Sequence, residues 1–451
     1  MRPTKRWDEV QIFFVYDTAY VLNEYDDPQN AIIYFHPDDL SDTVRCTLCC
    51  QLMGILQFCK SVFSPPKMIN LQTKKFAIKV TGRFALCLGG TSDMPDSVLH
   101  RQLLSLFNLF TFYHKSFEAV FEECRYRCNK FEDIMEMMCK KYLSASQHFG
   151  NTQTLTFQAL PSLYLPKSAG IIFLRASQIL QSCIDVEGVI SGCIVTKNEV
   201  LYTLLPPSIL RLLWFIPAHK PELLATSVKT VFPLPDCTFL VYVYLSEDQM
   251  SDIDTVPTEM EKNETNTSNS FDKIDKMNKF VLYMQGNSET QLMVLMKEES
   301  SKDPIKITKL WKIGLSSLVD LEMDIKNCLE NTLKKDFADN YLLMQYDQMW
   351  ANMKGHTIPA RPEKINDQLF NRSTQLIHEI LDQDSSIKSF SLRHADSLIY
   401  THSLGSLQTY CQYNLSKMHL SDKLECAAEI VNSVEGATKC NLERDHGIIL
   451  L

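Results

Sequence analysis

The fold of this chain is decided between residues 11 and 62. Two short runs of β-branched and aromatic residues, QIFFVY at Gln11–Tyr16 and AIIYFH at Ala31–His36, precede the longer segment TVRCTLCCQLMGILQFCKSV at Thr43–Val62. Turn-forming residues separate the two short runs, and this pattern predicts a pair of strands. The apolar residues of the longer segment recur at helical spacing, so we expect a helix there.

The same alternation of element types continues toward residue 145. Three further strands are predicted at Met68–Leu71, Lys75–Val80 and Phe84–Gly89. Pro95 is expected to open one helix, and a second helix is expected from Phe117 to about Leu143. We therefore expect residues 10–145 to form an α/β (α+β) layer, in which helices pack on a mainly antiparallel sheet.

Beyond this region, changes in composition divide the chain further. Residues 158–246 contain a predicted hairpin, an apolar helix and the strand Thr238–Leu245, which repeats the element order of the first domain in a shorter form. Residues 247–279 are acidic and polar, and we expect a disordered linker there because they offer few apolar side chains to bury. Residues 280–451 are expected to form a third domain, which opens with strands at Phe280–Met284 and Gln291–Met296 and ends with a helix at Leu424–Val434.

Composition excludes several classes of protein. The 451 residues carry a formal net charge of -9 and show no basic stripe with interleaved aromatics, so nucleic acid is not an expected partner. No apolar run approaches the roughly 20 residues of a membrane span, and the first residues do not resemble a secretory signal. We therefore expect a cytoplasmic protein whose 15 cysteines are reduced thiols.

The helix predicted at Thr43–Val62 is apolar around most of its circumference. One stripe is expected to face the core, and it consists of Leu48, Leu52, Ile55, Cys59 and Val62. Further apolar residues occupy much of the remaining surface, so this helix needs cover on both sides. Either the same domain supplies that cover, or a second protein chain packs against the helix.

No residue pattern points to covalent catalysis, to a metal or to a cofactor. Cys46, Cys49 and Cys50 lack the further ligands that a zinc site requires. The glycines at Gly89 and Gly90 lack the spacing of a phosphate-binding loop. His36 lies near two aspartates, but no nucleophile elbow accompanies it, so we predict no catalytic residue. A cysteine-dependent enzyme is the alternative that thiol labelling would test.

Several of these segments resemble a known family. Phe13–Asp17 and Ile33–Pro37 are similar to the opening of the CCZ/INTU/Hermansky-Pudlak type 4 longin family. Ser64–Pro66, Lys74–Val80 and Leu103–Tyr113 are similar to the type 4 branch of that family. The resemblance covers the first domain, about a third of the chain, and it implies three longin-like domains in total.

The resemblance also implies partners and a location. Members of the family form obligate heterodimers, and the implied partner is the Hermansky-Pudlak syndrome type 1 protein in the biogenesis of lysosome-related organelles complex 3. This complex is a nucleotide exchange factor for Rab GTPases of the 32/38 subfamily. Recruitment of the cytoplasmic complex to lysosome-related organelle or endosomal membranes, by peripheral association, is implied as well.

The expected contact surface follows from joining the apolar helix to this family. We expect the first domain to supply a GTPase or partner interface that consists of His36, Pro37, Thr47, Cys50, Gln51 and Gly54. An alternative remains open, since a longin scaffold that tethers a GTPase or coat without catalysing exchange would use a similar apolar platform.

Overall fold

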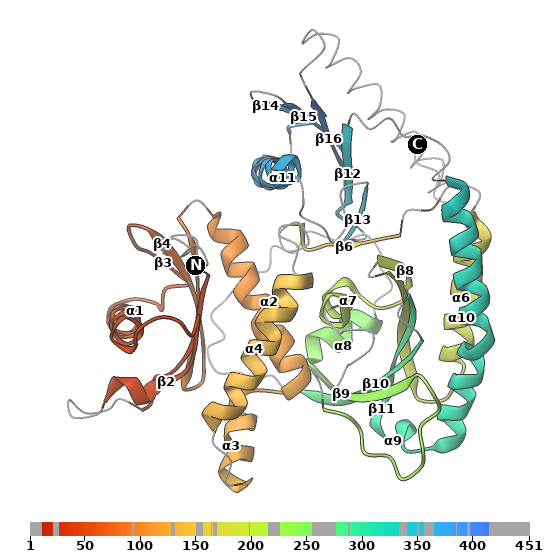
Figure 1. Ribbon diagram of the computed structural model, residues 1–451, viewed down its shortest axis with the longest axis horizontal. Helices are drawn as coiled ribbons and strands as arrows, with labels where there is room; N and C mark the ends of the chain where they lie inside the picture. The colour runs from red at the N-terminus through yellow and green to blue at the C-terminus, as the bar shows by residue number, and fades with distance from the viewer. Residues whose placement is uncertain are drawn as a thin grey trace. The chain divides into compact units, whose positions relative to one another are not determined.

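The computed structural model has a mixed α/β fold with three β-sheets, each packed with helices (Figure 1). It describes residues 11–20, 27–92, 94–127, 131–149, 157–163, 165, 169–197, 199–214, 226–254, 277–286, 289–332, 341–349, 351–355, 365–384, 386–394 and 397–414. The chain divides into two compact units. The first is built around residues 1–150, and the second contains residues 151–220 and 281–451.

The first sheet has five strands in the order β2-β1-β5-β4-β3. These strands are β1 (Ile12–Asp17), β2 (Ile32–His36), β3 (Met68–Asn70), β4 (Lys74–Thr81) and β5 (Phe84–Thr91). Every neighbouring pair is antiparallel. The helices are η2 (Pro28–Ala31), α1 (Asp42–Val62), α2 (Asp96–His114), α3 (Phe117–Arg127) and α4 (Phe131–Phe149).

Helices cover both faces of this first sheet (Figure 1). On one face, α1 packs Leu52 and Met53 against a core that includes Phe14 and Phe76. On the other face, the Phe84 ring of β5 lies 6.1 Å from the Phe117 ring of α3, which stacks on Phe110 of α2 with 3.9 Å between the ring centroids. Because successive residues of a strand point to opposite faces, a run such as Ile12–Tyr16 that is buried throughout requires this two-sided cover.

A partly buried ion pair connects β1 to the β4–β5 hairpin. Gly82 has a φ of +50° in the turn, a conformation that favours glycine. The next residue, Arg83, donates from Nε to Asp17 Oδ1 at 2.9 Å, and its guanidinium lies 4.6 Å from the Phe121 ring centroid. Asp17 is buried, so the carboxylate depends on this partner to balance its charge.

The second sheet has the order β8-β7-β11-β10-β9. Its strands are β7 (Val189–Thr196), β8 (Glu199–Thr203), β9 (Thr238–Leu245), β10 (Asn278–Gly286) and β11 (Thr290–Lys297). The helices of this region are α6 (Gly170–Ile184), α7 (Pro207–Trp214), α8 (Glu247–Asp254), α9 (Glu298–Ser301) and α10 (Pro304–Thr332). Helices α6 and α10 run side by side (Figure 1).

The third sheet has the order β14-β15-β16-β12-β13-β6. Its strands are β6 (Leu160–Pro161), β12 (Tyr341–Asp347), β13 (Asn352–Gly355), β14 (Ser389–Arg393), β15 (Ser397–Leu404) and β16 (Leu407–Asn414). Helix α11 (Ile365–Gln383) packs Phe370 and Ile377 into a core with Tyr346 and Tyr410. Strand β6 pairs with β13 in parallel, whereas the other pairings within this sheet are antiparallel.

The three sheets share one strand order. We number the five strands of each sheet along the chain, leave β6 aside, and read the third sheet from β13 to β14. The spatial order is then second, first, fifth, fourth, third in every sheet. The helix between the second and third strands is α1 in the first sheet, α7 in the second and α11 in the third. The same arrangement therefore occurs three times along the chain.

The structure corrects several expectations. The helix expected over Phe117–Leu143 is two helices, α3 and α4, on either side of residues 128–130. Strands β10 and β11 were expected to open the third domain at residue 280, but β11 pairs with β7 along its whole length and so belongs to the second sheet. Helices α6 and α11 and strand β13 were not expected.

Two expectations fall largely or wholly outside the described residues. These are the disordered linker at residues 247–279, of which the structure describes only α8 and the first strand residues of β10, and the final helix at residues 424–434. Among the helices that are described, none combines the length and the apolarity that crossing a membrane requires.

Candidate functional site

Helix α1 presents a partly apolar face away from the first sheet. The residues of this outer face lie on one side of the helix, and they are Val44, Thr47, Gln51, Gly54, Ile55, Phe58 and Val62. The apolar members are exposed, with Phe58 at 63% and Val62 at 55% of their full accessible area. Phe63, directly after the helix, is 74% exposed. Large apolar side chains exposed in one row are typical of a surface that binds another protein.

The opposite face of α1 carries the core contacts. Its buried residues are Leu48, Cys49, Leu52, Met53 and Leu56. The core stripe predicted from sequence was therefore correct for Leu48 and Leu52 but wrong for Ile55 and Val62, which lie on the outer face. Both faces are apolar, so spacing alone could not decide which one the sheet covers. Phe58, which lies outside the predicted core stripe, is also on the outer face, although the predicted interface did not include it.

Three of the predicted interface residues lie together on the outer face. Thr47, Gln51 and Gly54 are exposed, and a Cβ atom built on Gly54 would meet nothing within 4 Å. The Thr47 hydroxyl donates to Thr43 O at 2.7 Å, so it is satisfied within the helix. Cys50 lies at the flank of this face and is half-buried.

His36 and Pro37 lie elsewhere in the first unit. Strand β2 ends at His36, on the side of the sheet that α4 covers, where Lys140 Nζ approaches Asp38 Oδ2 at 2.8 Å and Glu136 Oε1 at 2.6 Å. Burial has the largest effect on the pKa of His36 and lowers it. Asp38 and Asp39 raise this pKa, and Lys140 lowers it by a smaller amount. The side chain of His36 thus lies on the opposite face of the sheet from α1, whose core includes the neighbouring Phe35.

Two thiols of α1, those of Cys49 and Cys50, lie in an environment that disfavours their ionisation. The sulfur atoms of Cys46 and Cys50 are 3.8 Å apart. Burial, followed by the hydrogen bond with Cys46, raises the pKa of Cys50 to about 11, and burial raises the pKa of Cys49 further. A thiol acts as a nucleophile through its thiolate, so Cys49 and Cys50 are poorly suited to covalent chemistry near neutral pH.

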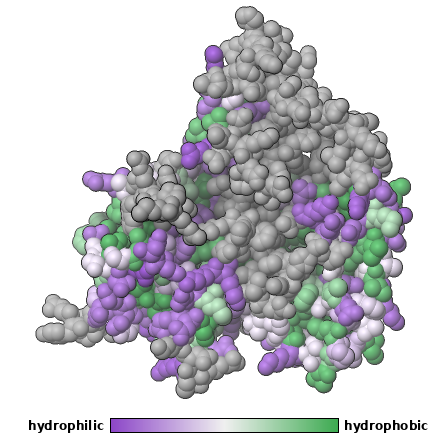
Figure 2. Space-filling model, viewed as in Figure 1, coloured by the Kyte–Doolittle hydropathy of each residue, from purple (hydrophilic) through white to green (hydrophobic). Residues whose placement is uncertain are grey.

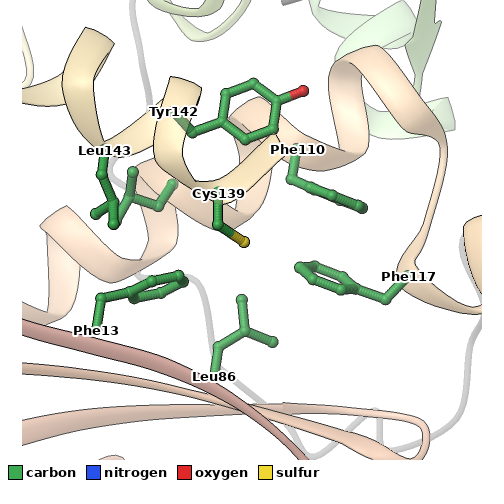
Figure 3. A pocket seen from close by; sticks show the side chains of 8 residues that line it. Phe13, Leu86, Phe110, Phe117, Cys139, Tyr142 and Leu143 are labelled. Atoms are coloured by element: carbon green, nitrogen blue, oxygen red, sulfur yellow. The ribbon is translucent and has the colours of Figure 1, made fainter. Parts of the chain in front are cut away.

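A small cavity lies between the first sheet and helices α2 to α4 (Figure 3). Its volume is ≈ 10 Å³, and its lining is almost wholly apolar, including Phe13, Leu86 and Phe110. The Tyr142 hydroxyl points away from it in Figure 3. Ligand pockets typically measure about 300 Å³ or more, so this space is a packing gap in the core. Within the described ranges, no group of three or more His, Cys, Asp or Glu side chains is arranged to hold a metal ion.

Comparison with known proteins identifies the class of domain that carries the outer face of α1. The family model for the first longin domain of INTU, CCZ1 and HPS4 matches residues 10–115, which include the whole first sheet with α1 and α2. The resemblance seen at Phe13–Asp17 and Ile33–Pro37 is thereby confirmed, and these residues form a first longin domain of this family.

One relative extends the similarity beyond that domain. The chain is 27% identical over 255 residues to the BLOC-3 complex member HPS4 of Mus musculus. The matched region covers 55% of this chain but only 37% of the mouse protein. The chain therefore carries a first longin domain of the INTU, CCZ1 and HPS4 kind and is similar to HPS4 over about half of its own length, and the match spans little more than a third of its relative's length.

Proposed function

We propose that this chain is one subunit of a heterodimeric guanine-nucleotide exchange factor for a Rab GTPase of the 32/38 subfamily. The proposed partner subunit is the Hermansky-Pudlak syndrome type 1 protein, because the relative in mouse is described as a member of the BLOC-3 complex. The observation that carries the proposal is a first longin domain whose α1 helix is apolar on the outer face as well as on the core face.

Exchange of this kind requires no nucleophile and no general acid. A protein that binds the nucleotide-free GTPase more tightly than the nucleotide-bound form must weaken nucleotide binding by the same factor. In a GTPase, the parts that open to release the nucleotide are the switch loops and the Mg²⁺ site. An apolar surface that fits the open form is therefore sufficient, and the outer face of α1 offers one. The cytoplasmic complex would act after peripheral recruitment to lysosome-related organelle or endosomal membranes.

Within this proposal, Thr47, Gln51 and Gly54 lie at the centre of the contact. Ile55 and Phe58 extend it toward the end of the helix, and Cys50 borders it. A GTPase or the partner chain could approach closely at Gly54, because no side chain stands there. His36, on the α4 side of the sheet, would belong to a second contact, together with Pro37 at the end of β2.

The second and third sheets are proposed to be longin-like domains that hold the heterodimer together. Their support is the strand order that they share with the first sheet. Helix α10 also exposes a row of apolar side chains at helical spacing, with Leu315, Val319 and Met323 all more than half exposed. Figure 2 shows apolar side chains at the surface over α6 and α10, on the right of the view.

The test is nucleotide release from a panel of purified Rabs carrying labelled GDP. We expect the chain co-expressed with the type 1 partner to elute as one complex and to accelerate release from a single Rab subgroup. A Gln51→Arg variant should slow that release, since it places a charge on the outer face of α1.

The alternative function, a longin adaptor that tethers without exchange, predicts a different result. In that case the complex would bind a Rab but leave GDP release unchanged. A folded chain that neither pairs nor binds any Rab would contradict both functions.

A further inference from the structure

Strand β14 ends the third sheet, and its outer edge pairs with no strand in the described part of the chain. It pairs with β15 in antiparallel register, from Ser389↔His402 to Arg393↔Leu398. Ser403 N donates to Lys388 O at 2.7 Å, and His394 N donates to Ser397 O at 2.8 Å. Bonded and non-bonded pairs alternate in such a ladder, so the even-numbered residues bond to β15. The backbone N–H and C=O groups of Ser389, Ser391 and Arg393 therefore point outward, where no described residue pairs with them.

The other sheet edges are shorter, covered or buried. At the edge of the second sheet, Val228 N donates to Leu240 O and Tyr242 N donates to Thr226 O, which covers β9. At its opposite edge, β8 bridges to Ser162. In the first sheet, β3 has three residues, and the central residues of β2 are buried. Exposed edge strands are usually protected by such devices, whereas β14 contains neither proline nor an inward-facing charge.

The side chains along β14 define the kind of segment that would fit beside it. Phe390 and Leu392 point toward α11 and are only partly buried, at the margin of the third core. An added strand with apolar residues at alternate positions would extend this row. Lys388 and Arg393, at the two ends of β14, are exposed and form no ion pair within the described part of the chain. Opposite charge is therefore favoured in the segment that binds.

We propose that β14 is a docking edge for an extended acidic segment of another protein, which adds to the third sheet as a further strand. Recognition would come from the outward backbone groups of Ser389, Ser391 and Arg393. Selectivity would come from apolar residues that pack beside Phe390 and Leu392, and from carboxylates that approach Lys388 and Arg393. This surface lies outside the first longin domain, so the proposal does not depend on nucleotide exchange.

The test uses the full chain and three short labelled peptides in which valine alternates with glutamate, serine or lysine. We expect the glutamate peptide to bind most tightly and the lysine peptide most weakly, as measured by fluorescence anisotropy. Bound glutamate peptide should slow amide hydrogen exchange at Ser389, Ser391 and Arg393. The substitution Ser391→Pro removes an outward N–H without removing a bond to β15, and it should weaken binding by about tenfold.

Ser391→Ala is the matched control, because it keeps the backbone N–H and should bind as the unaltered chain does. Equal binding by Ser391→Pro and Ser391→Ala would overturn the proposal, as would slowed exchange at other amides or no binding of the acidic peptide. If Ser391→Pro fails to fold, the pair Lys388→Glu and Arg393→Glu decides the matter. The variant that carries both charge reversals should prefer the lysine peptide. An unchanged preference for the glutamate peptide would contradict the proposed docking edge.

Discussion

At the scale of single residues, Glu199 shows how burial alters a carboxyl group. It begins β8 at the β7–β8 hairpin, and burial raises its pKa from 4.5 to about 7, against a smaller opposing effect of Lys197. The folded state therefore binds more protons than the unfolded state between these two values. Stability is expected to decrease as pH rises through this window, because the buried group must ionise there.

Replacement of Glu199 by glutamine should remove this dependence. We expect Glu199→Gln to stabilise the chain by about 2 kcal/mol at about pH 8, and to have little effect at about pH 3, where the carboxyl is protonated in both states. Urea unfolding of both proteins across this range measures the difference. Glu187→Gln, at an exposed carboxylate, is the control. A stabilisation that is the same at every pH would contradict the assigned burial.

At the scale of elements, two helical glycines have opposite roles. Gly54 in α1 has open space where a Cβ would lie. Gly314 in α10 lies against β10, and a Cβ there would come within 2.3 Å of Gln285 Oε1. Gln285 Nε2 donates to Trp311 O at 3.0 Å, and Gln285 accepts from the Tyr283 hydroxyl at 2.8 Å. Gly314 therefore permits a close approach of helix to strand, whereas Gly54 leaves a helix surface bare.

The same substitution should thus have opposite effects in these two helices. Gly54→Ala is expected to stabilise the isolated chain by up to about 1 kcal/mol, the usual gain of alanine over glycine in a helix. Gly314→Ala should destabilise it by about 1 to 3 kcal/mol, since Gln285 must move and its buried hydrogen bonds are disturbed. Chemical denaturation of the two variants gives both values. Two changes of equal sign would contradict the packing of α10 on β10.

At the scale of the whole molecule, the proposed partner should contribute to stability. A protein that binds only the folded chain raises the apparent stability by mass action. We expect the thermal unfolding midpoint to rise with partner concentration. Phe58→Glu should reduce this rise while leaving the midpoint of the chain alone nearly unchanged, because Phe58 is 63% exposed. Gln57→Glu adds the same charge on the flank of α1 and should keep the rise. If the partner raised the midpoint of both variants equally, the outer face of α1 would not be part of the partner contact.

Local pattern in the sequence was sufficient for most individual strands and for the first sheet. Strand β9 lies at the predicted Thr238–Leu245, and α1 differs from its prediction by one residue at its start. Alternation at period two and recurrence near 3.6 residues are local properties of a chain, so they can be read without the fold. The apolar circumference of α1 likewise indicated that both of its sides need cover.

Only the tertiary structure decided which sheet a strand joins and which helix face is buried. Strands β10 and β11 lie beyond a polar segment from β7 to β9, yet they complete the same sheet, because backbone hydrogen bonds between strands depend on spatial neighbours. Ile55 and Val62 suit a core as well as Leu48 does, and their exposure follows from the side on which the first sheet lies. Composition and spacing specify what a segment can bury, whereas packing against distant segments determines what it does bury.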